Sequence, residues 1–214
     1  MGAVPPASGP APLVARVVLL CGPSGVGKTS LVRRLGLPAV ALDDHYRDAD
    51  AEGLPHRRGT VDWDDPRSWD ADAALATLTA LCTRGWADVP VYDIPTSRRT
   101  GTTRLSLGGA PLVVAEGIFA AQLVGPCRDA GLLADAVCVA LAPTRTFWRR
   151  LLRDLAEMRK PPVLLLRRGW ALCRAQPALV ARWSALGCRV LTPARAEAEI
   201  RALAGRAPAG RRPA

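Results

Sequence analysis

The stretch "VARVVLLCGPSGVGKTSLVRRLG", residues 14–36, joins an apolar run to a glycine-rich turn and an amphipathic segment. Residues 14–22 have the continuous apolar character of a buried strand, and residues 27–36 have helical spacing that ends at Gly36. Between them, "GPSGVGKT" (22–29) matches the pattern GxxxxGK[ST] at every position. Such a turn between a strand and a helix predicts a phosphate-binding loop, because its glycines let backbone N–H groups converge on phosphate oxygens.

The phosphate-binding loop, or P-loop, predicts roles for its polar side chains. Lys28 is expected to reach the β- and γ-phosphates of ATP, and the Thr29 hydroxyl is expected to bind Mg²⁺. Lys28 is also one of only two lysines in an arginine-rich chain, which argues against a chance match. The predicted nucleotide-binding residues are Gly22, Pro23, Ser24, Gly25, Val26, Gly27, Lys28, Thr29 and Ser30.

Apolar runs alternate with segments of helical periodicity over the rest of the chain. Strands are expected at 38–43, 88–93, 110–117 and 134–141, with a short one near 188–191. Helices are expected within 65–85, at about 144–158 and 162–187, and up to about 204. This alternation predicts an α/β fold with a five-stranded, mainly parallel sheet that has helices on both faces.

Two smaller features and two arms are expected around this sheet. Alternation and turn residues predict a small β-hairpin insertion at 96–109, and a helical lid is expected at about 144–162. We expect a single domain at 13–204 between flexible Pro/Gly/Ala-rich arms at 1–12 and 205–214.

Composition argues against several classes of protein. The net charge is +10, but only two of the 29 basic residues are lysine and three charges lie in the C-terminal arm, so nucleic-acid binding is not favoured. No apolar run approaches 18 residues, so no membrane span is expected. The N-terminus lacks the pattern of a signal peptide, and the six cysteines form no CxxC pair. These features favour reduced thiols, a cytoplasmic protein and no zinc site.

The P-loop predicts nucleotide binding but leaves the reaction open. The chain contains no Asn, which excludes the NKxD guanine-reading motif of GTPases, and it has no LSGGQ-type signature of transporter ATPases. At 214 residues, a small kinase is the remaining common solution. Such an enzyme needs a carboxylate near the γ-phosphate, an acceptor pocket and a cationic lid.

Two carboxylates stand where such a kinase would need them. Asp43 ends the strand expected at 38–43, and Glu116 ends the apolar run "LVVAEG". Both strands are expected to flank the P-loop strand, which would place both carboxylates at the sheet edge where ligands of open α/β sheets bind. A charge after four apolar residues is unfavourable unless it meets a metal or a donor. The alternative is that each carboxylate only caps a strand end.

The candidate lid is "FWRRLLRDLAEMRK" (147–160), whose arginines suit phosphate because each presents a planar, bidentate fork. Arg149 and Arg153 are four residues apart and share one helical face, and Arg150 and Arg153 share the neighbouring one. The alternative is a solvated face on which these arginines pair with the intervening acidic residues.

The motifs together resemble those of the uridine-cytidine kinases and the wider uridine kinase-like, phosphoribulokinase-related P-loop kinases. In chain order they are "GPSGVGKTS", "LDDHYRD", "VDWDDP", "VPVYD", "VVAEGI" and "RRLLRD…RK", all within residues 16–160. Each motif is short, but six in the family's order and near its spacing are specific. The resemblance implies Mg²⁺- and ATP-dependent phosphoryl transfer to a small-molecule hydroxyl, with the 5′-OH of a pyrimidine nucleoside favoured.

The resemblance also implies roles for single positions. Asp43 corresponds to the residue that takes the proton of the acceptor hydroxyl, and Thr29, Asp43 and Glu116 correspond to the metal-side groups. The implied catalytic set is Asp43, Lys28, Arg150 and Arg153, with Lys160 as a further lid cation at the nucleotide. The implied substrate-binding residues are Tyr46, Asp64, Tyr92, Ser97, Arg99 and Glu116. Among these, Asp64 would hold ribose hydroxyls and Tyr92 would line the base pocket.

The sequence departs from the family where the base would be read. Ser97 stands where uridine-cytidine kinases have a His that helps to read the pyrimidine, and His45 stands where an aromatic residue is usual. A kinase of another small alcohol, such as a sugar phosphate, pantothenate or a specialised metabolite, and a non-catalytic nucleotide-binding regulator therefore stay open as alternatives. The choice between ATP and GTP as donor and the assembly into a homo-oligomer also stay open.

Overall fold

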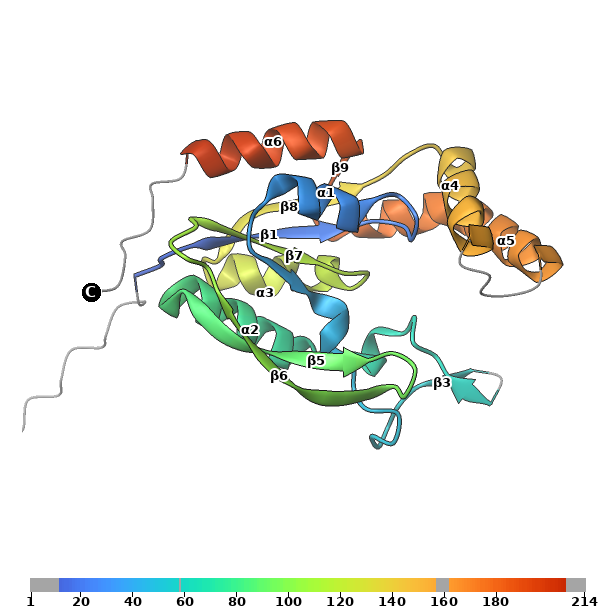
Figure 1. Cartoon of the computed structure of the whole chain (residues 1–214), viewed down its shortest axis with the longest axis horizontal. Helices are drawn as coiled ribbons and strands as arrows, with labels where there is room; N and C mark the ends of the chain where they lie inside the picture. Colours follow the sequence, from blue (N-terminus) through green and yellow to red (C-terminus); the bar gives the residue numbers. More distant parts are fainter. Residues whose placement is uncertain (1–11, 58, 157–161, 207–214) are drawn as a thin grey trace, which may run out of the picture.

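The computed structural model describes residues 12–57, 59–156 and 162–206, without the side chains of 150, 153–156 and 162–169. Five parallel strands form the central sheet, in the order β2-β7-β1-β8-β9 (Figure 1). Their bounds are β1 (Arg16–Cys21), β2 (Ala39–Ala41), β7 (Leu112–Glu116), β8 (Leu133–Val139) and β9 (Arg189–Leu191). The predicted α/β fold with a five-stranded parallel sheet is therefore confirmed.

Helices cover both faces of this sheet, as Figure 1 shows. They are α1 (Lys28–Leu35), α2 (Ala71–Arg84), α3 (Val124–Asp129), α4 (Pro143–Ala156), α5 (Pro162–Ala185) and α6 (Pro193–Arg206). Because successive side chains of β1 alternate between faces, Val18 and Leu20 pack with α1 and α6, whereas Val17 and Leu19 pack with α2 and α3. All four side chains are fully buried, which explains the continuous apolar run in the sequence.

The hairpin differs from the one expected at 96–109. Residues of this segment form a single strand, β6 (Arg98–Ser106), which pairs antiparallel with β5 (Trp86–Asp93) in a separate two-stranded sheet. The strand expected at 88–93 is thus not part of the parallel sheet. The physical reason is visible in β5 itself, because only one of its faces is buried and it contains a proline, whereas the inner parallel strands are apolar on both faces.

The strand that precedes Asp43 also lies elsewhere than expected. β2 pairs with β7 and not with β1, so one strand separates it from the P-loop strand. β2 ends at Ala41 and continues as the 3₁₀ helix η1 (Leu42–His45), which contains Asp43. The short helix therefore brings Asp43 toward the P-loop across the carboxyl end of β7.

The remaining elements surround the carboxyl edge of the sheet. They are the short hairpin β3 (His56–Arg57) and β4 (Thr60–Val61) and the 3₁₀ helices η2 (Pro66–Ser68) and η3 (Ala120–Leu123). Helices α4 and α5 pack on each other beside this edge (Figure 1). The expected arms at 1–12 and 205–214 fall largely outside the described residues. In the described part of the chain, no helix is long and apolar enough to cross a membrane.

Candidate active site

The P-loop turns sharply from β1 into α1, and glycine is needed at two of its positions. A Cβ at Gly22 would collide with the backbone carbonyl oxygen of Val139 on β8. Gly27, which caps the N-terminus of α1, has a φ of 102°, in the left-handed region that favours glycine. The Lys28 ammonium donates to the Gly22 carbonyl oxygen at 2.8 Å. This contact folds the lysine back across the loop.

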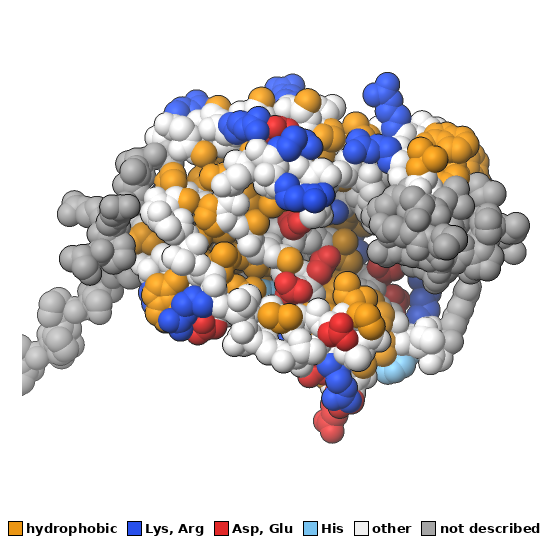
Figure 2. All heavy atoms as spheres, in the orientation of Figure 1, with side chains coloured by type: hydrophobic (Ala, Val, Ile, Leu, Met, Phe, Trp, Pro, Cys, Tyr) orange, Lys and Arg blue, Asp and Glu red, His pale blue; other side chains and the backbone are white. Residues whose placement is uncertain are grey.

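Two carboxylates lie close to the Lys28 ammonium, Glu116 at the end of β7 and Asp43 in η1. Burial lowers the pKa of Lys28, and the attraction of Glu116 and then of Asp43 opposes this shift. Burial raises the pKa of Asp43 and of Glu116, and in both cases the nearby Lys28 opposes it. The structure therefore brings together three of the predicted site residues in one charge-coupled cluster. On the face of the molecule drawn in Figure 2, acidic side chains lie near the middle, below a band of basic side chains.

Asp43 has little room on its protein side. A Cβ at Gly117 would lie 2.9 Å from Asp43 Oδ1 and 2.9 Å from Leu42 Cβ, closer than real contacts allow. The backbone N–H of Ile118 donates to the Asp43 carboxylate and lowers its pKa against the larger effect of burial. The side chain nevertheless stays accessible to water on its open side. Gly117 thus acts as a positioning residue for Asp43, and the sequence signal for it is the glycine of "VVAEGI".

The oxygen atoms at this site fit a magnesium ion carried by nucleotide phosphates. A hydrogen bond with the Thr29 side chain lowers the pKa of Glu116, which places this hydroxyl beside the carboxylate. Hydroxyl and carboxylate oxygens are ligands that Mg²⁺ accepts, and Mg²⁺ usually takes only one or two carboxylates in addition to phosphates. Within the described ranges, no group of three or more His, Cys, Asp or Glu side chains could hold a metal by itself. The donor set therefore suits a metal that arrives with the nucleotide.

An arginine of α4 lies against the P-loop. Arg149 Nη2 would be 3.3 Å from a Cβ at Gly27, so its guanidinium lies beside the N-terminus of α1, where phosphate would bind. The predicted lid cations were Arg150 and Arg153, whose side chains lie outside the described part, and Lys160, which lies outside the described residues. Arg149 is thus the lid residue that the position-by-position resemblance missed, although helical spacing placed it on the same face as Arg153.

Aromatic side chains form a wall next to Asp43. Tyr46 contacts Trp63, Tyr92 and Phe119, with ring centroids 5.5, 5.8 and 5.9 Å away. The Tyr46 hydroxyl donates to the Trp63 carbonyl oxygen at 3.1 Å, and the Tyr92 hydroxyl donates to the Arg47 carbonyl oxygen at 3.3 Å. Both predicted substrate-binding tyrosines therefore use their hydroxyls inside the protein, and their rings are what they can offer to a ligand.

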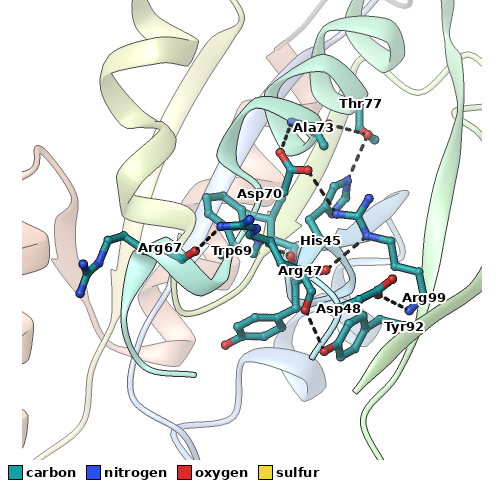
Figure 3. Close-up of polar contacts among 12 residues, drawn as sticks. His45, Arg47, Asp48, Arg67, Trp69, Asp70, Ala73, Thr77, Tyr92 and Arg99 are labelled. Atoms are coloured by element: carbon teal, nitrogen blue, oxygen red, sulfur yellow. Dashed lines mark hydrogen bonds and ion pairs between the residues drawn. The ribbon is translucent and has the colours of Figure 1, made fainter. Parts of the chain in front are cut away.

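A polar network behind this wall fixes η1 and the hairpin (Figure 3). Arg99 of β6 donates from Nε to the Tyr46 carbonyl oxygen at 3.2 Å and from Nη2 to Asp70 Oδ2 at 3.3 Å. The buried His45 ring meets the Thr77 hydroxyl of α2, with 3.1 Å between Nε2 and Oγ1. Arg99 was predicted to bind substrate, but these contacts make it a brace that joins the hairpin to η1 and α2.

Ser97 lies in the turn between β5 and β6. Its φ is 52°, and its hydroxyl donates to the Ile94 carbonyl oxygen at 3.3 Å. Its carbonyl oxygen accepts from the Ala49 N–H at 2.9 Å, which ties the turn to the loop after η1. The residue at the predicted base-reading position thus satisfies its hydroxyl locally.

A cavity of about 640 Å³ adjoins the P-loop. Gly22, Pro23 and Ser24 line one part of it, and Asp64, which was predicted to bind substrate, lies in its lining. The side opposite the P-loop comes from α4 and α5, which carry Phe147, Leu172, Cys173, Leu179 and Trp183 into the lining. The contribution of α5 to this cavity was not predicted, because its apolar residues have the pattern of an ordinary helix.

No protein-family model matches the chain. Among curated proteins, it is 35% identical over 151 residues to the inorganic pyrophosphatase TTM2 of Arabidopsis thaliana, which covers 68% of this chain and 21% of that protein. The chain thus spans about a fifth of the length of that relative. A crystal structure of a candidate fructose transport system kinase from Silicibacter sp. TM1040 matches 82% of this chain and 88% of that chain, with a TM-score of 0.55 and 20% identity, and shows the same fold.

Uridine kinases match over a larger share of their own length. The uridine kinase of Chloroflexus aggregans is 33% identical over 149 residues, which cover 66% of this chain and 68% of that enzyme. The uridine kinase of Leuconostoc citreum is 30% identical over 150 residues, with 66% and 69% covered. Together with the P-loop and the parallel sheet, these matches show that the chain belongs to the uridine kinase family of P-loop kinases.

Proposed function

We propose that the protein is an ATP-dependent phosphotransferase that moves the γ-phosphoryl group to a hydroxyl of a small molecule, with the 5′-OH of a pyrimidine nucleoside as the favoured acceptor. The observation that carries this proposal is the cluster of Lys28, Glu116 and Asp43 at the P-loop, next to a cavity of suitable size for a small molecule. The 33% identity to a uridine kinase supports the nucleoside as acceptor.

Different residues at the site act on ATP and on the acceptor. Lys28 and Arg149 lie where they would neutralise the phosphate charge that spreads in the transition state. Asp43 takes the proton of the acceptor hydroxyl while the oxygen forms its bond to the γ-phosphorus and the bond to the β-phosphate oxygen breaks. Because burial raises the pKa of Asp43, its carboxylate holds a proton more readily than an ordinary Asp.

The metal-side residues orient the nucleotide. Thr29 and Glu116, together with Asp43, would hold Mg²⁺, which when bound balances the charge of the phosphates. Glu116 also keeps Lys28 in place by attraction before ATP arrives. Burial raises the pKa of both Glu116 and Asp43, and the nearby Lys28 opposes this shift.

An acceptor screen tests the proposed function. Uridine, cytidine, other nucleosides and common polyols are incubated with ATP and Mg²⁺, and phosphorylated products are identified by mass spectrometry and ³¹P NMR. We expect transfer to a nucleoside 5′-OH. Transfer only to another alcohol would keep the kinase and exclude the nucleoside, whereas tight ATP binding without transfer to any acceptor would establish a nucleotide-binding regulator instead.

A further inference from the structure

The cavity beside the P-loop has an apolar stripe on its α5 wall. Leu172, Ala175, Leu179 and Trp183 follow one another at helical spacing and form this stripe, and the same helix adds Cys173, Gln176, Ala178 and Arg182 to the lining. Its volume of about 640 Å³ lies within the range of small-molecule sites. Ile118, another lining residue, follows Gly117, where an added Cβ would lie 2.9 Å from Asp43 Oδ1, so this part of the cavity lining is close to the proposed base.

Two leucines of the stripe are uncovered although they face a cavity. Leu172 is 39% exposed and Leu179 is 38% exposed. Single exposed leucines are common on protein surfaces, but two that line a concave site next to a catalytic cluster indicate apolar surface that a ligand would cover. Leu186, just after the end of α5, is 37% exposed and does not line the cavity, which makes it a matched control.

Two polar lining groups near α5 are engaged within the protein. The Gln176 side-chain amide donates to the Leu141 carbonyl oxygen at 2.8 Å, and the Thr146 hydroxyl donates to the Ala142 carbonyl oxygen at 3.5 Å. Ser24 and Asp64 line the cavity toward the P-loop and η2, and Gln122 and Arg182 are further polar lining residues. Tyr92 and Ser97 stand at the positions that the resemblance implies for reading a base, and both donate their hydroxyls to backbone carbonyl oxygens of the protein.

We propose that the apolar stripe of α5 binds the ring of the acceptor by shape and apolar contact, so that the enzyme accepts alcohols with an aromatic or branched aliphatic ring whether or not the ring carries hydrogen-bonding edges. This inference rests on the proposed function and defines its substrate class. The acceptor hydroxyl lies toward Asp43, the polar part of the acceptor lies toward Asp64, and the ring covers Leu172 and Leu179. A ring without amide or amino groups loses little where it covers Leu172, Ala175 and Leu179, because these side chains offer only apolar contact.

Three ribosides that all carry a 5′-OH can separate the effect of ring shape from the effect of ring polarity on acceptor binding. Uridine, phenyl β-D-riboside and methyl β-D-riboside are compared as acceptors, with kcat/KM for transfer and Kd from titration calorimetry as two readouts. We expect phenyl riboside to be used within about threefold of uridine and methyl riboside about tenfold or more below both, since a missing apolar group of this size is worth at least one order of magnitude. A phenyl riboside as poor as methyl riboside would overturn the inference.

A pair of variants then assigns the effect to the stripe. Leu179→Ala should raise Kd and KM for uridine and phenyl riboside about tenfold and leave methyl riboside and the KM of ATP unchanged, whereas Leu186→Ala should change none of them. Equal behaviour of the two variants would overturn the inference and leave the kinase proposal intact. Absence of transfer to any riboside would overturn the nucleoside as the proposed acceptor, while the Kd values would still decide whether the stripe binds the ring.

Discussion

The phosphate half and the acceptor half of the site differ in how they are built. The phosphate half is local, because the P-loop, Lys28 and Thr29 lie within eight consecutive residues and their geometry follows from one turn between a strand and a helix. The proposed acceptor half would draw on η1, the loop after β7, the β5–β6 hairpin and α5, which are far apart in the chain. Local sites can be read from a motif, whereas assembled sites depend on packing.

The two halves meet at Asp43. This residue contributes to the charge cluster of Lys28 and is held from the acceptor side by Gly117 and Ile118. Changes on the phosphate side should therefore affect binding of ATP and transfer together. Changes on the acceptor side should affect transfer or acceptor binding and leave ATP binding intact.

The largest effect is expected from the phosphate half. Lys28→Ala removes the cation that is attracted to both Glu116 and Asp43, and kcat/KM for ATP should fall by about 100- to 1000-fold. Arg33→Ala, which removes an exposed charge from the same helix, is the control and should be near neutral. Steady-state kinetics measure both, and a Lys28 variant within tenfold of the wild type would contradict the assignment.

A smaller effect is expected where the halves meet. In Gly117→Ala the added Cβ would lie 2.9 Å from Asp43 Oδ1, so the carboxylate must shift, and kcat should fall about tenfold while the Kd of ATP is kept. Gly125→Ala adds a methyl group to a helix where nothing lies within 4 Å and should leave kcat unchanged. Equal kcat values for the two variants would show that Asp43 is not held in the way described.

The sequence was sufficient for the fold class and the phosphate half for a physical reason. Buried parallel strands must be apolar on both faces, and the P-loop must follow such a strand, so both leave a continuous signal in the chain. The pairing of β5 with β6 was harder to predict, because strand 86–93 has a plausible apolar pattern and only its one-sided burial separates it from the parallel sheet.

The acceptor half could be predicted only in part. Asp43, Tyr46 and Asp64 were found through motifs, and the structure places all three around the same edge of the sheet. Helical spacing placed Arg149 on one face with Arg153, but the resemblance matched Arg150 and Arg153 to the lid, so Arg149 was not in the predicted set. The contribution of α5 to the cavity was not visible because an apolar stripe has the same pattern whether it faces a core or a cavity.

The reactivity of the cysteines toward a labelling reagent tests which part of the site is open to solvent. Cys173 lies on the cavity wall and is only partly buried, whereas Cys21, Cys82, Cys127, Cys138 and Cys188 are buried. N-ethylmaleimide should therefore modify Cys173 first, and a bound acceptor should slow this reaction severalfold while ATP alone should not. Peptide mass spectrometry measures the rate, and first modification of a buried thiol, or protection by ATP alone, would contradict this picture of the cavity.

The smallest effect on activity is expected from a substitution of His45, whose effect should appear in the stability of the fold instead. Burial, followed by the charge of Arg99, lowers the pKa of His45 to about 4 from its usual 6.5. Below pH 6.5 the His45 side chain takes up a proton in the unfolded chain but not in the folded protein. The contribution of neutral His45 to the free energy of unfolding is therefore fully present above pH 6.5 and is lost as the pH falls from about 6.5 to about 4. The loss between pH 6.5 and pH 5 should be about 2 kcal/mol, because each pH unit contributes about 1.4 kcal/mol.

The pH dependence can be isolated by difference. Urea denaturation of the wild type and of His45→Gln is compared at pH 7.5 and pH 5, so that the contributions of the nearby Asp70 and of other groups cancel. The variant should lose less stability than the wild type over this interval, and turnover at pH 7.5 should stay within about twofold. A parallel loss in both proteins would mean that His45 does not stay neutral in the folded state.

Single-turnover transfer by Asp43→Asn tests the central claim most directly. The variant keeps the shape of the side chain and removes its ability to take the acceptor proton, so the transfer rate to the best acceptor should fall about 100-fold while the Kd of ATP changes less than threefold. Quenched-flow measurement of the product, with ATP titrated in parallel, gives both numbers. Near-normal transfer, or loss of ATP binding in step with transfer, would contradict a site in which Asp43 joins a phosphate half to an acceptor half.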